Sequence, residues 1–187
     1  MAETSRMTPL GTPMPEFALT DTVTGETVKS SDLWGSRGML VMFICNHCPY
    51  VQHVQQGLVS LGRDYEDADL AIVAISPNDP TDYPDDSPEA MAAEARRVGY
   101  RFPYLYDETQ EVARAYGAVC TPDFFLYGPE RTLVYRGRLD ASRPRTDVPV
   151  TGEDLRAAID AVLAGRPVPG EQHPSMGCSI KWRSDGA

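Results

Sequence analysis

The sequence lacks the features that would place this chain in a membrane or on nucleic acid. No apolar run approaches the roughly 20 residues that a membrane-spanning helix needs. The opening residues, MAETSRMTPLGTPMPEF, hold no apolar core of signal-peptide length. Lys and Arg number 17 against 27 Asp and Glu, and the formal net charge is −10. An acidic chain repels phosphate backbones, so we expect no nucleic-acid partner. Because a signal-peptide core and a membrane span are both missing, we expect a cytoplasmic protein without a membrane partner.

Cysteine is also scarce, with four residues at positions 45, 48, 120 and 178. In a reducing compartment, few cysteines indicate catalysis or redox sensing rather than a framework of structural disulfides. The 187 residues contain no internal repeat and no dividing linker, so we expect one domain over 1–187. Its core is expected at about 10–165, after a flexible start and before a Pro/Gly-rich tail at 166–187.

The most informative stretch is 38–61, where an apolar run is followed by a helical pattern. The run at 39–44 predicts a buried strand, and apolar residues at 51, 54, 58 and 61 predict a helix. Cys45-Asn46-His47-Cys48-Pro49 lies between the two. Free backbone N–H groups and the positive end of the helix dipole favour a thiolate at a helix start. The C-x-x-C at this junction therefore predicts a thiol redox site.

Each residue of the motif receives an expected role. Cys45 is the candidate nucleophile, with a pKa below the free value of about 8.5. Cys48 is the candidate resolving thiol, and His47 is expected to stabilise the thiolate. Inert core cysteines and half of a zinc site are the alternatives, but no second pair of ligands follows at zinc-site spacing. We expect no metal and no organic cofactor.

Thr121-Pro122 is the second signal, because only proline makes a cis peptide bond cheap. A cis bond here would bring the Thr121 backbone beside the redox pair, where an extended substrate segment could pair with it. An ordinary trans proline at a strand edge is the alternative. Cys120 and Cys178 are either two separate buried cysteines or, if the tail folds back, a second redox pair.

The remaining patterns predict strands alternating with helices, then a hairpin and a last helix. Strands are expected at 15–19, 26–28, 70–75, 102–106, 123–127 and 133–139. Further helices are expected at 32–34, ended by Gly35, at 89–98 after a Ser87 cap, at 109–116 after a Thr109 cap, and at 153–163. The acidic segment 78–87 is interpreted as a solvated loop. The fold class is α/β, a central mixed β-sheet flanked by helices, with an N-terminal β-hairpin and a C-terminal tail.

Several segments together resemble the thioredoxin-like superfamily, specifically the peroxiredoxin-like group of the AhpC/TSA (redoxin) families. They are PEFAL at 15–19, DLWG at 32–35, CNHCPYV at 45–51, YPDDSP at 83–88, CTPDFF at 120–125 and GCSIKW at 177–182. The resemblance implies a thioredoxin-like fold and thiol-based redox activity. Peroxiredoxins place a threonine three residues before the peroxidatic cysteine, and this alignment puts Cys45 at the threonine position and Cys48 at the peroxidatic one. No arginine between 119 and 126 completes that site.

Three functions remain open from the sequence. The first is a thiol–disulfide oxidoreductase, in which Cys45 attacks a protein or small-molecule disulfide, Cys48 resolves the mixed disulfide, and a thiol donor restores the pair. The second is an antioxidant thiol peroxidase in which Cys45 reacts with a hydroperoxide. The third is a redox-inactive module that binds a partner through the Thr121-Pro122 edge. The oligomeric state is left open.

Overall fold

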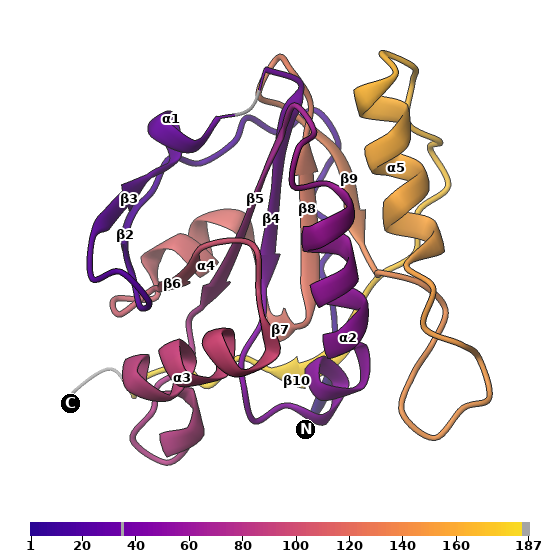
Figure 1. Cartoon of the computed structure of the whole chain (residues 1–187). Helices are drawn as coiled ribbons and strands as arrows, with labels where there is room; N and C mark the ends of the chain where they lie inside the picture. Colours follow the sequence, from indigo (N-terminus) through magenta and orange to yellow (C-terminus); the bar gives the residue numbers. More distant parts are fainter. Residues whose placement is uncertain (35, 185–187) are drawn as a thin grey trace.

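The main sheet is built from the apolar segments of the sequence. The computed structural model describes residues 1–34 and 36–184. The seven strands of this sheet lie in the order β3-β2-β6-β5-β4-β8-β9 (Figure 1). They are β2 Ala18–Asp21, β3 Thr27–Lys29, β4 Gly38–Phe43, β5 Leu70–Ser76, β6 Tyr104–Tyr106, β8 Asp123–Tyr127 and β9 Leu133–Gly137. Strands β4, β5 and β6 are parallel and the outer pairings are antiparallel, so the mixed sheet and the N-terminal hairpin β2–β3 are confirmed.

Strand β4 lies in the interior of this sheet, and all of its residues are buried. Successive side chains of a strand point to opposite faces. Leu40 and Met42 therefore belong to one apolar core, and Val41 and Phe43 belong to a second core on the other face. A strand covered on both faces needs an unbroken apolar run, which is why the sequence pattern located β4 correctly.

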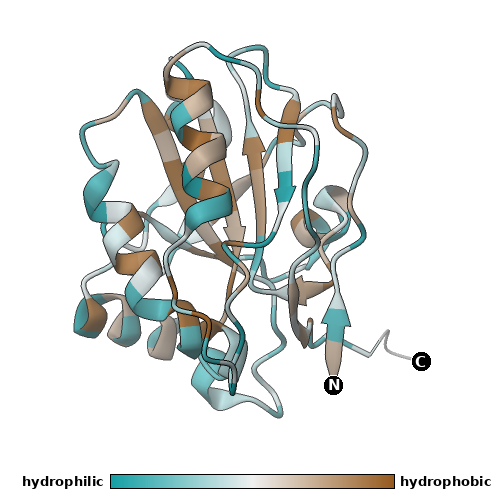
Figure 2. Cartoon of the chain, turned by 90° about the vertical axis from the view of Figure 1, so that its right-hand side faces the viewer, coloured by the Kyte–Doolittle hydropathy of each residue, from teal (hydrophilic) through white to brown (hydrophobic). Residues whose placement is uncertain are grey.

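Helices cover both faces of the sheet, and apolar residues line the sheet beneath them (Figure 2). Helices α2 Pro49–Asp64, α3 Pro88–Val98 and α5 Glu153–Leu163 pack on the face of Leu40, and α4 Glu111–Tyr116 packs on the face of Val41. The short α1 Ser30–Leu33 lies on the same face of the sheet as α4. No helix in the described part of the chain is long and apolar enough to cross a lipid bilayer.

The helix starts agree with the sequence in one case and differ in another. Ser87 caps α3 as expected, because its Oγ accepts a hydrogen bond from the Ala90 N–H at 3.2 Å. Helix α4 begins at Glu111, one residue later than the Thr109 cap predicts. Gln110 precedes it in the left-handed region with φ of 65°, which keeps the backbone before Glu111 out of the helix. Gly35, expected to end α1, lies outside the described residues.

The two ends of the chain form strands that the sequence did not predict. Strand β10, Met176–Ser179, lies between β1, Ala2–Thr4, and β7, Cys120–Thr121, in a second, three-stranded sheet. Figure 1 shows the N-terminus beside β10, below the main sheet. All of β1 is exposed, so it carries no buried alternation that a sequence pattern could reveal. The start of the chain, expected to be flexible, and the tail, for which no strand was expected, both pair through their backbones with distant segments.

The Ser87 cap gives a test of the fold. We expect Ser87→Ala to lower the free energy of unfolding by about 1 kcal/mol, because the first turn of α3 loses a hydrogen-bond acceptor. Denaturant unfolding monitored by circular dichroism measures the change. Ser31→Ala, at an exposed serine of α1, is the control. A loss in Ser87→Ala no larger than in Ser31→Ala would contradict the cap.

Candidate functional site

The C-x-x-C motif forms the loop between β4 and α2. Strand β4 ends at Phe43, and α2 begins at Pro49, so Cys48 is the N-cap residue of the helix. Proline fits the first helical position, because its missing N–H would have no helical partner there. The positive end of the helix dipole acts within the first turn. Cys48 is therefore the cysteine that the helix terminus favours as a thiolate, whereas the sequence assigned this effect to Cys45.

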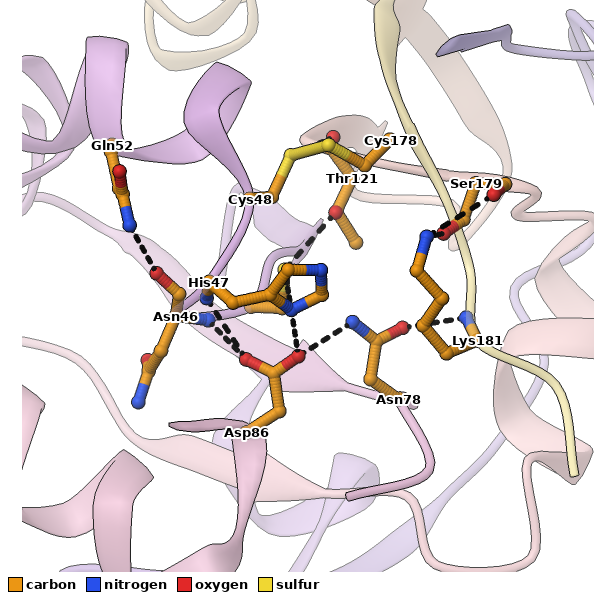
Figure 3. Close-up of a disulfide and its surroundings, with 11 residues drawn as sticks. Asn46, His47, Cys48, Gln52, Asn78, Asp86, Thr121, Cys178, Ser179 and Lys181 are labelled. Carbon is orange, nitrogen blue, oxygen red and sulfur yellow. Dashed lines mark hydrogen bonds and ion pairs between the residues drawn. A yellow bond between two sulfur atoms is a disulfide. The ribbon is translucent and has the colours of Figure 1, made fainter. Parts of the chain in front are cut away.

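Cys48 is bonded to Cys178 of β10, and Cys45 is a free thiol (Figure 3). The tail therefore reaches the redox loop. Of the two alternatives that the sequence left open, the Cys120–Cys178 pair does not form, and Cys178 is not a separate cysteine either. In the ladder between β10 and β7, Cys178 stands opposite Thr121 and Ser179 stands opposite Cys120. Opposed residues share a face and neighbours alternate, so Cys120 faces away from Cys178. Cys120 is a free, buried thiol.

Thr121 lies against both cysteines of the motif. Its Oγ1 is 3.3 Å from Sγ of Cys45, and its carbonyl oxygen is 3.4 Å from Sγ of Cys48. The second approach is a contact without a hydrogen bond, because a disulfide sulfur carries no proton. The Thr121–Pro122 peptide bond is cis, as predicted. The structure thus brings Cys45, Cys48 and Cys178 together around the Thr121–Pro122 turn.

Burial controls the protonation of Cys45, whose side chain is 1% exposed. Loss of solvation raises the pKa of the Cys45 thiol from 9.0 to about 12, and the nearby Asp86 carboxylate adds to the rise. The Thr121 hydroxyl, the Cys48 N–H and the Lys181 ammonium act in the opposite direction, with smaller effects. The lowered pKa expected from the sequence is thus wrong for Cys45 in this disulfide-bonded arrangement. The helix start that was meant to lower this pKa belongs to Cys48.

Asp86 holds the redox loop in place. It ends the 3₁₀ turn Pro84–Asp86, and its side chain is completely buried. Its Oδ1 accepts the backbone N–H groups of Asn46 at 2.7 Å and His47 at 3.1 Å. Its Oδ2 accepts the side-chain N–H of Asn78 at 2.9 Å and is paired with His47 Nδ1. The interpretation of 78–87 as a solvated loop is therefore wrong for Asp86, although Asp82 and Asp85 are exposed.

His47 is directed to Asp86 rather than to the thiol. Its Nδ1 pairs with Asp86 Oδ2 and lies 3.9 Å from Sγ of Cys45. The imidazole also stacks on Tyr83, with ring centroids 4.4 Å apart. An Nδ1 that is occupied by a carboxylate cannot also serve Cys45 as a close donor. The role expected for His47 at the thiolate therefore stays a prediction, and its observed role is to fix the loop.

Asn78 and Lys181 extend this network to the tail, as Figure 3 shows. The Oδ1 atom of Asn78 accepts the Lys181 backbone N–H at 2.9 Å while its amide donates to Asp86. The Lys181 ammonium donates to the Ser179 carbonyl oxygen at 2.7 Å. Sequence reasoning assigned none of Asn78, Asp86 and Lys181 a role. The available signal was the place of Asp86 and Lys181 within segments that resemble the family, at 83–88 and 177–182.

One group of side chains could hold a metal ion. Donor atoms of Cys45, His47 and Asp86 all lie within 4.8 Å of one another. Thiolate, imidazole and carboxylate are a set that Zn²⁺ accepts. In the structure, however, His47 Nδ1 and Asp86 Oδ2 bind each other, so an ion would have to separate them.

Comparison with known proteins agrees with this architecture. The family model described as AhpC/TSA family matches residues 10–136. The structure of an uncharacterized conserved protein from Geobacillus kaustophilus is 54% identical and has a TM-score of 0.97, and the match covers 100% of this chain and 98% of that one. A hypothetical protein from Sinorhizobium meliloti is 46% identical with a TM-score of 0.94, covering 97% of this chain and 98% of that one.

A more distant likeness concerns the fold alone. The thioredoxin domain of a thiol-disulfide oxidoreductase from Bacteroides vulgatus is 18% identical and has a TM-score of 0.63. The match covers 83% of this chain and 99% of that domain. The comparison with curated proteins gives no match. The structural likeness to that thioredoxin domain confirms the thioredoxin-like fold implied by the sequence resemblance.

The charge of Asp86 gives a test of the site. Its carboxylate disfavours a second negative charge on Cys45, so Asp86→Asn should lower the pKa of that thiol. We expect alkylation of Cys45 in the oxidised protein to begin at a pH lower by about one unit. Mass spectrometry of the labelled peptide over a pH series measures the shift. Asp85→Asn, at the exposed neighbouring acid, should leave the profile unchanged, and equal profiles for both variants would refute the coupling.

Proposed function

This chain belongs to the AhpC/TSA family, and we propose that it is a thiol–disulfide oxidoreductase that exchanges disulfides through Cys48. The observation that carries the proposal is the Cys48–Cys178 bond at the N-terminus of α2, with the free thiol of Cys45 next to it. A sulfur at a helix N-terminus leaves readily as a thiolate and attacks readily as one. Both halves of a disulfide exchange require this property.

Reduction of the bond is expected to start at Cys178. This residue is partly exposed, whereas Cys48 is 0% exposed, so an external thiolate reaches the Cys178 sulfur more easily. Attack there forms a mixed disulfide between the donor and Cys178, and the Cys48 thiolate leaves. A leaving thiol with a lower pKa leaves faster, which again favours Cys48. A second donor thiolate then releases Cys178, and the donor carries away the new disulfide.

The reduced protein can then act on a substrate disulfide. The Cys48 thiolate attacks one sulfur of the substrate and the other substrate sulfur leaves as a thiolate. Cys178 or Cys45 then resolves the mixed disulfide. Resolution by Cys178 regenerates the bond of this structure, whereas resolution by Cys45 forms the C-x-x-C pair that the sequence predicts. The proposed partners are protein or small-molecule disulfides and a thiol electron donor.

A thiol peroxidase is the second candidate, favoured by membership of the AhpC/TSA family. In that reaction a hydroperoxide oxidises the Cys48 thiolate to a sulfenic acid. The Cys178 thiol condenses with the sulfenic acid, which releases water and leaves a Cys48–Cys178 disulfide. The two candidates therefore share Cys48 and Cys178 and differ in the oxidant.

Thiol chemistry on cysteine variants tests the proposal. We expect oxidised wild type to expose two thiols on denaturation and the reduced protein to expose four, because only one disulfide joins the four cysteines. Disulfide reduction by Cys48→Ser should fall to the uncatalysed rate, since the exchanging sulfur is gone. Thiol counting and an assay of disulfide reduction with a thiol donor measure the two effects.

Cys120→Ser is the matched control, because this buried thiol lies on the other face of β7. Peroxide consumption assayed on the same proteins separates the candidates. Loss of peroxide turnover in Cys48→Ser, with no disulfide reduction by wild type, would replace the oxidoreductase with the peroxidase. A wild type that performs neither reaction would overturn both and leave the redox-inactive binding module.

A further inference from the structure

The edge of β7 that the sequence assigned to an extended substrate is occupied by the chain itself. Strand β10 pairs with β7 in antiparallel register, with Cys178 opposite Thr121. The pairing continues beyond the strand, where the Ile180 N–H donates to the Val119 carbonyl oxygen at 3.0 Å. An extended polypeptide that joins a sheet edge makes the same main-chain contacts. The cysteine of this segment is already bonded to Cys48.

Glycine is required at the position before that cysteine. A Cβ atom at Gly177 would lie 1.9 Å from the Thr121 carbonyl oxygen and 3.1 Å from the Pro122 nitrogen. Backbone atoms cannot yield as the end of a long side chain can. Any residue other than glycine would therefore push β10 away from Thr121. The β7 edge therefore selects, by steric fit, a segment in which a glycine is followed by a cysteine.

The contacts that hold β10 are of two kinds. The covalent contact is the Cys48–Cys178 bond. The non-covalent contacts of the strand include the short ladder to β7, the pairing with the exposed β1, and the buried Ser175 and Ile180 on either side of the strand. Just beyond it, the Lys181 backbone is hydrogen-bonded to Asn78 and Gln110. Strand β1 pairs with β10 alone among the described strands, so it can leave with β10 without breaking another ladder.

We propose that β10 is an internal substitute for a substrate polypeptide. While Cys178 is bonded to Cys48, β10 closes the Thr121–Pro122 edge. Once a thiol donor has reduced this bond, the edge accepts an extended segment of another polypeptide that has a glycine directly before its cysteine. This inference rests on the proposed disulfide exchange at Cys48 and adds the kind of partner and the way in which access to the site is controlled.

A peptide copied from the tail provides the probe. The peptide PSMGCSIK, with its cysteine joined to an aromatic thiol, is mixed with the full-length Cys178→Ser protein in its reduced form. The Cys48 thiolate attacks the peptide sulfur, the bond from that sulfur to the aromatic thiol breaks, and the coloured aromatic thiolate leaves. A Cys48–peptide disulfide remains. We expect capture of PSMGCSIK to be about tenfold faster than capture of PSMACSIK, because the added methyl group meets the Thr121 carbonyl.

Two protein variants test the closing role of β10. Adding Gly177→Ala to Cys178→Ser should speed capture of PSMGCSIK severalfold, because the strand that competes for the edge is pushed off. Gly170→Ala in the same background is the matched control, since its Cβ would meet no atom within 4 Å. If Gly177→Ala prevents folding, the comparison of the two peptides on Cys178→Ser still decides the question.

Equal capture rates for the two peptides would overturn the inference, as would an unchanged rate in a folded Gly177→Ala variant. A small symmetric aromatic disulfide, which needs no strand edge, separates this failure from failure of the proposed function. If Cys48 reacts with that reagent but does not distinguish the peptides, the inference alone is wrong. If Cys48 reacts with neither reagent nor peptide, the proposed exchange is wrong as well.

Discussion

The buried carboxylate of Asp86 is the constraint on which the redox loop depends. A carboxylate without solvent must have its oxygens satisfied by donors, and the loop supplies them through the N–H groups of Asn46 and His47 and the His47 ring. Asp86, which lies far along the chain from the loop between β4 and α2, thereby fixes that loop. Asn78 connects the same carboxylate to the backbone of Lys181, so the loop and the tail share one network.

This network explains how a thiol can stay inert beside a disulfide. Burial and the Asp86 charge keep Cys45 protonated at neutral pH, with a pKa of about 12. A protonated thiol is a poor nucleophile, so Cys45 does not readily attack the neighbouring Cys48 sulfur while the tail is docked. Lys181, in the tail, carries a charge that favours the Cys45 thiolate. The position of the tail therefore affects the charge as well as the accessibility of the site.

Local pattern was enough to predict much of the fold. The apolar run of β4, the helical spacing of α2 and the Ser87 cap of α3 each follow from neighbouring residues, and the structure confirms them. The same reasoning placed Thr121 beside Cys45 and Cys48, and its atoms do contact both sulfurs, while the roles of these residues stay predictions. Strands β1 and β10 were not predicted, because each forms only by pairing with a segment far away in the sequence. The burial of Asp86 was not predicted, because one buried acid among exposed ones produces no periodic pattern in the sequence.

The pairing of the cysteines is a second case in which local sequence pattern could not predict a long-range contact. Sequence spacing favours Cys45 with Cys48, and it leaves Cys120 and Cys178 either separate or, if the tail folds back, paired with each other. The actual pairing is decided by register, since Cys178 stands opposite Thr121 and its neighbour Ser179 takes the place opposite Cys120. A shift of one residue in β10 would turn Cys178 to the face of Cys120. Gly177 opposes such a shift, because only glycine fits against the Thr121 carbonyl. A residue without a side chain thus determines whether Cys178 faces Cys48 or Cys120.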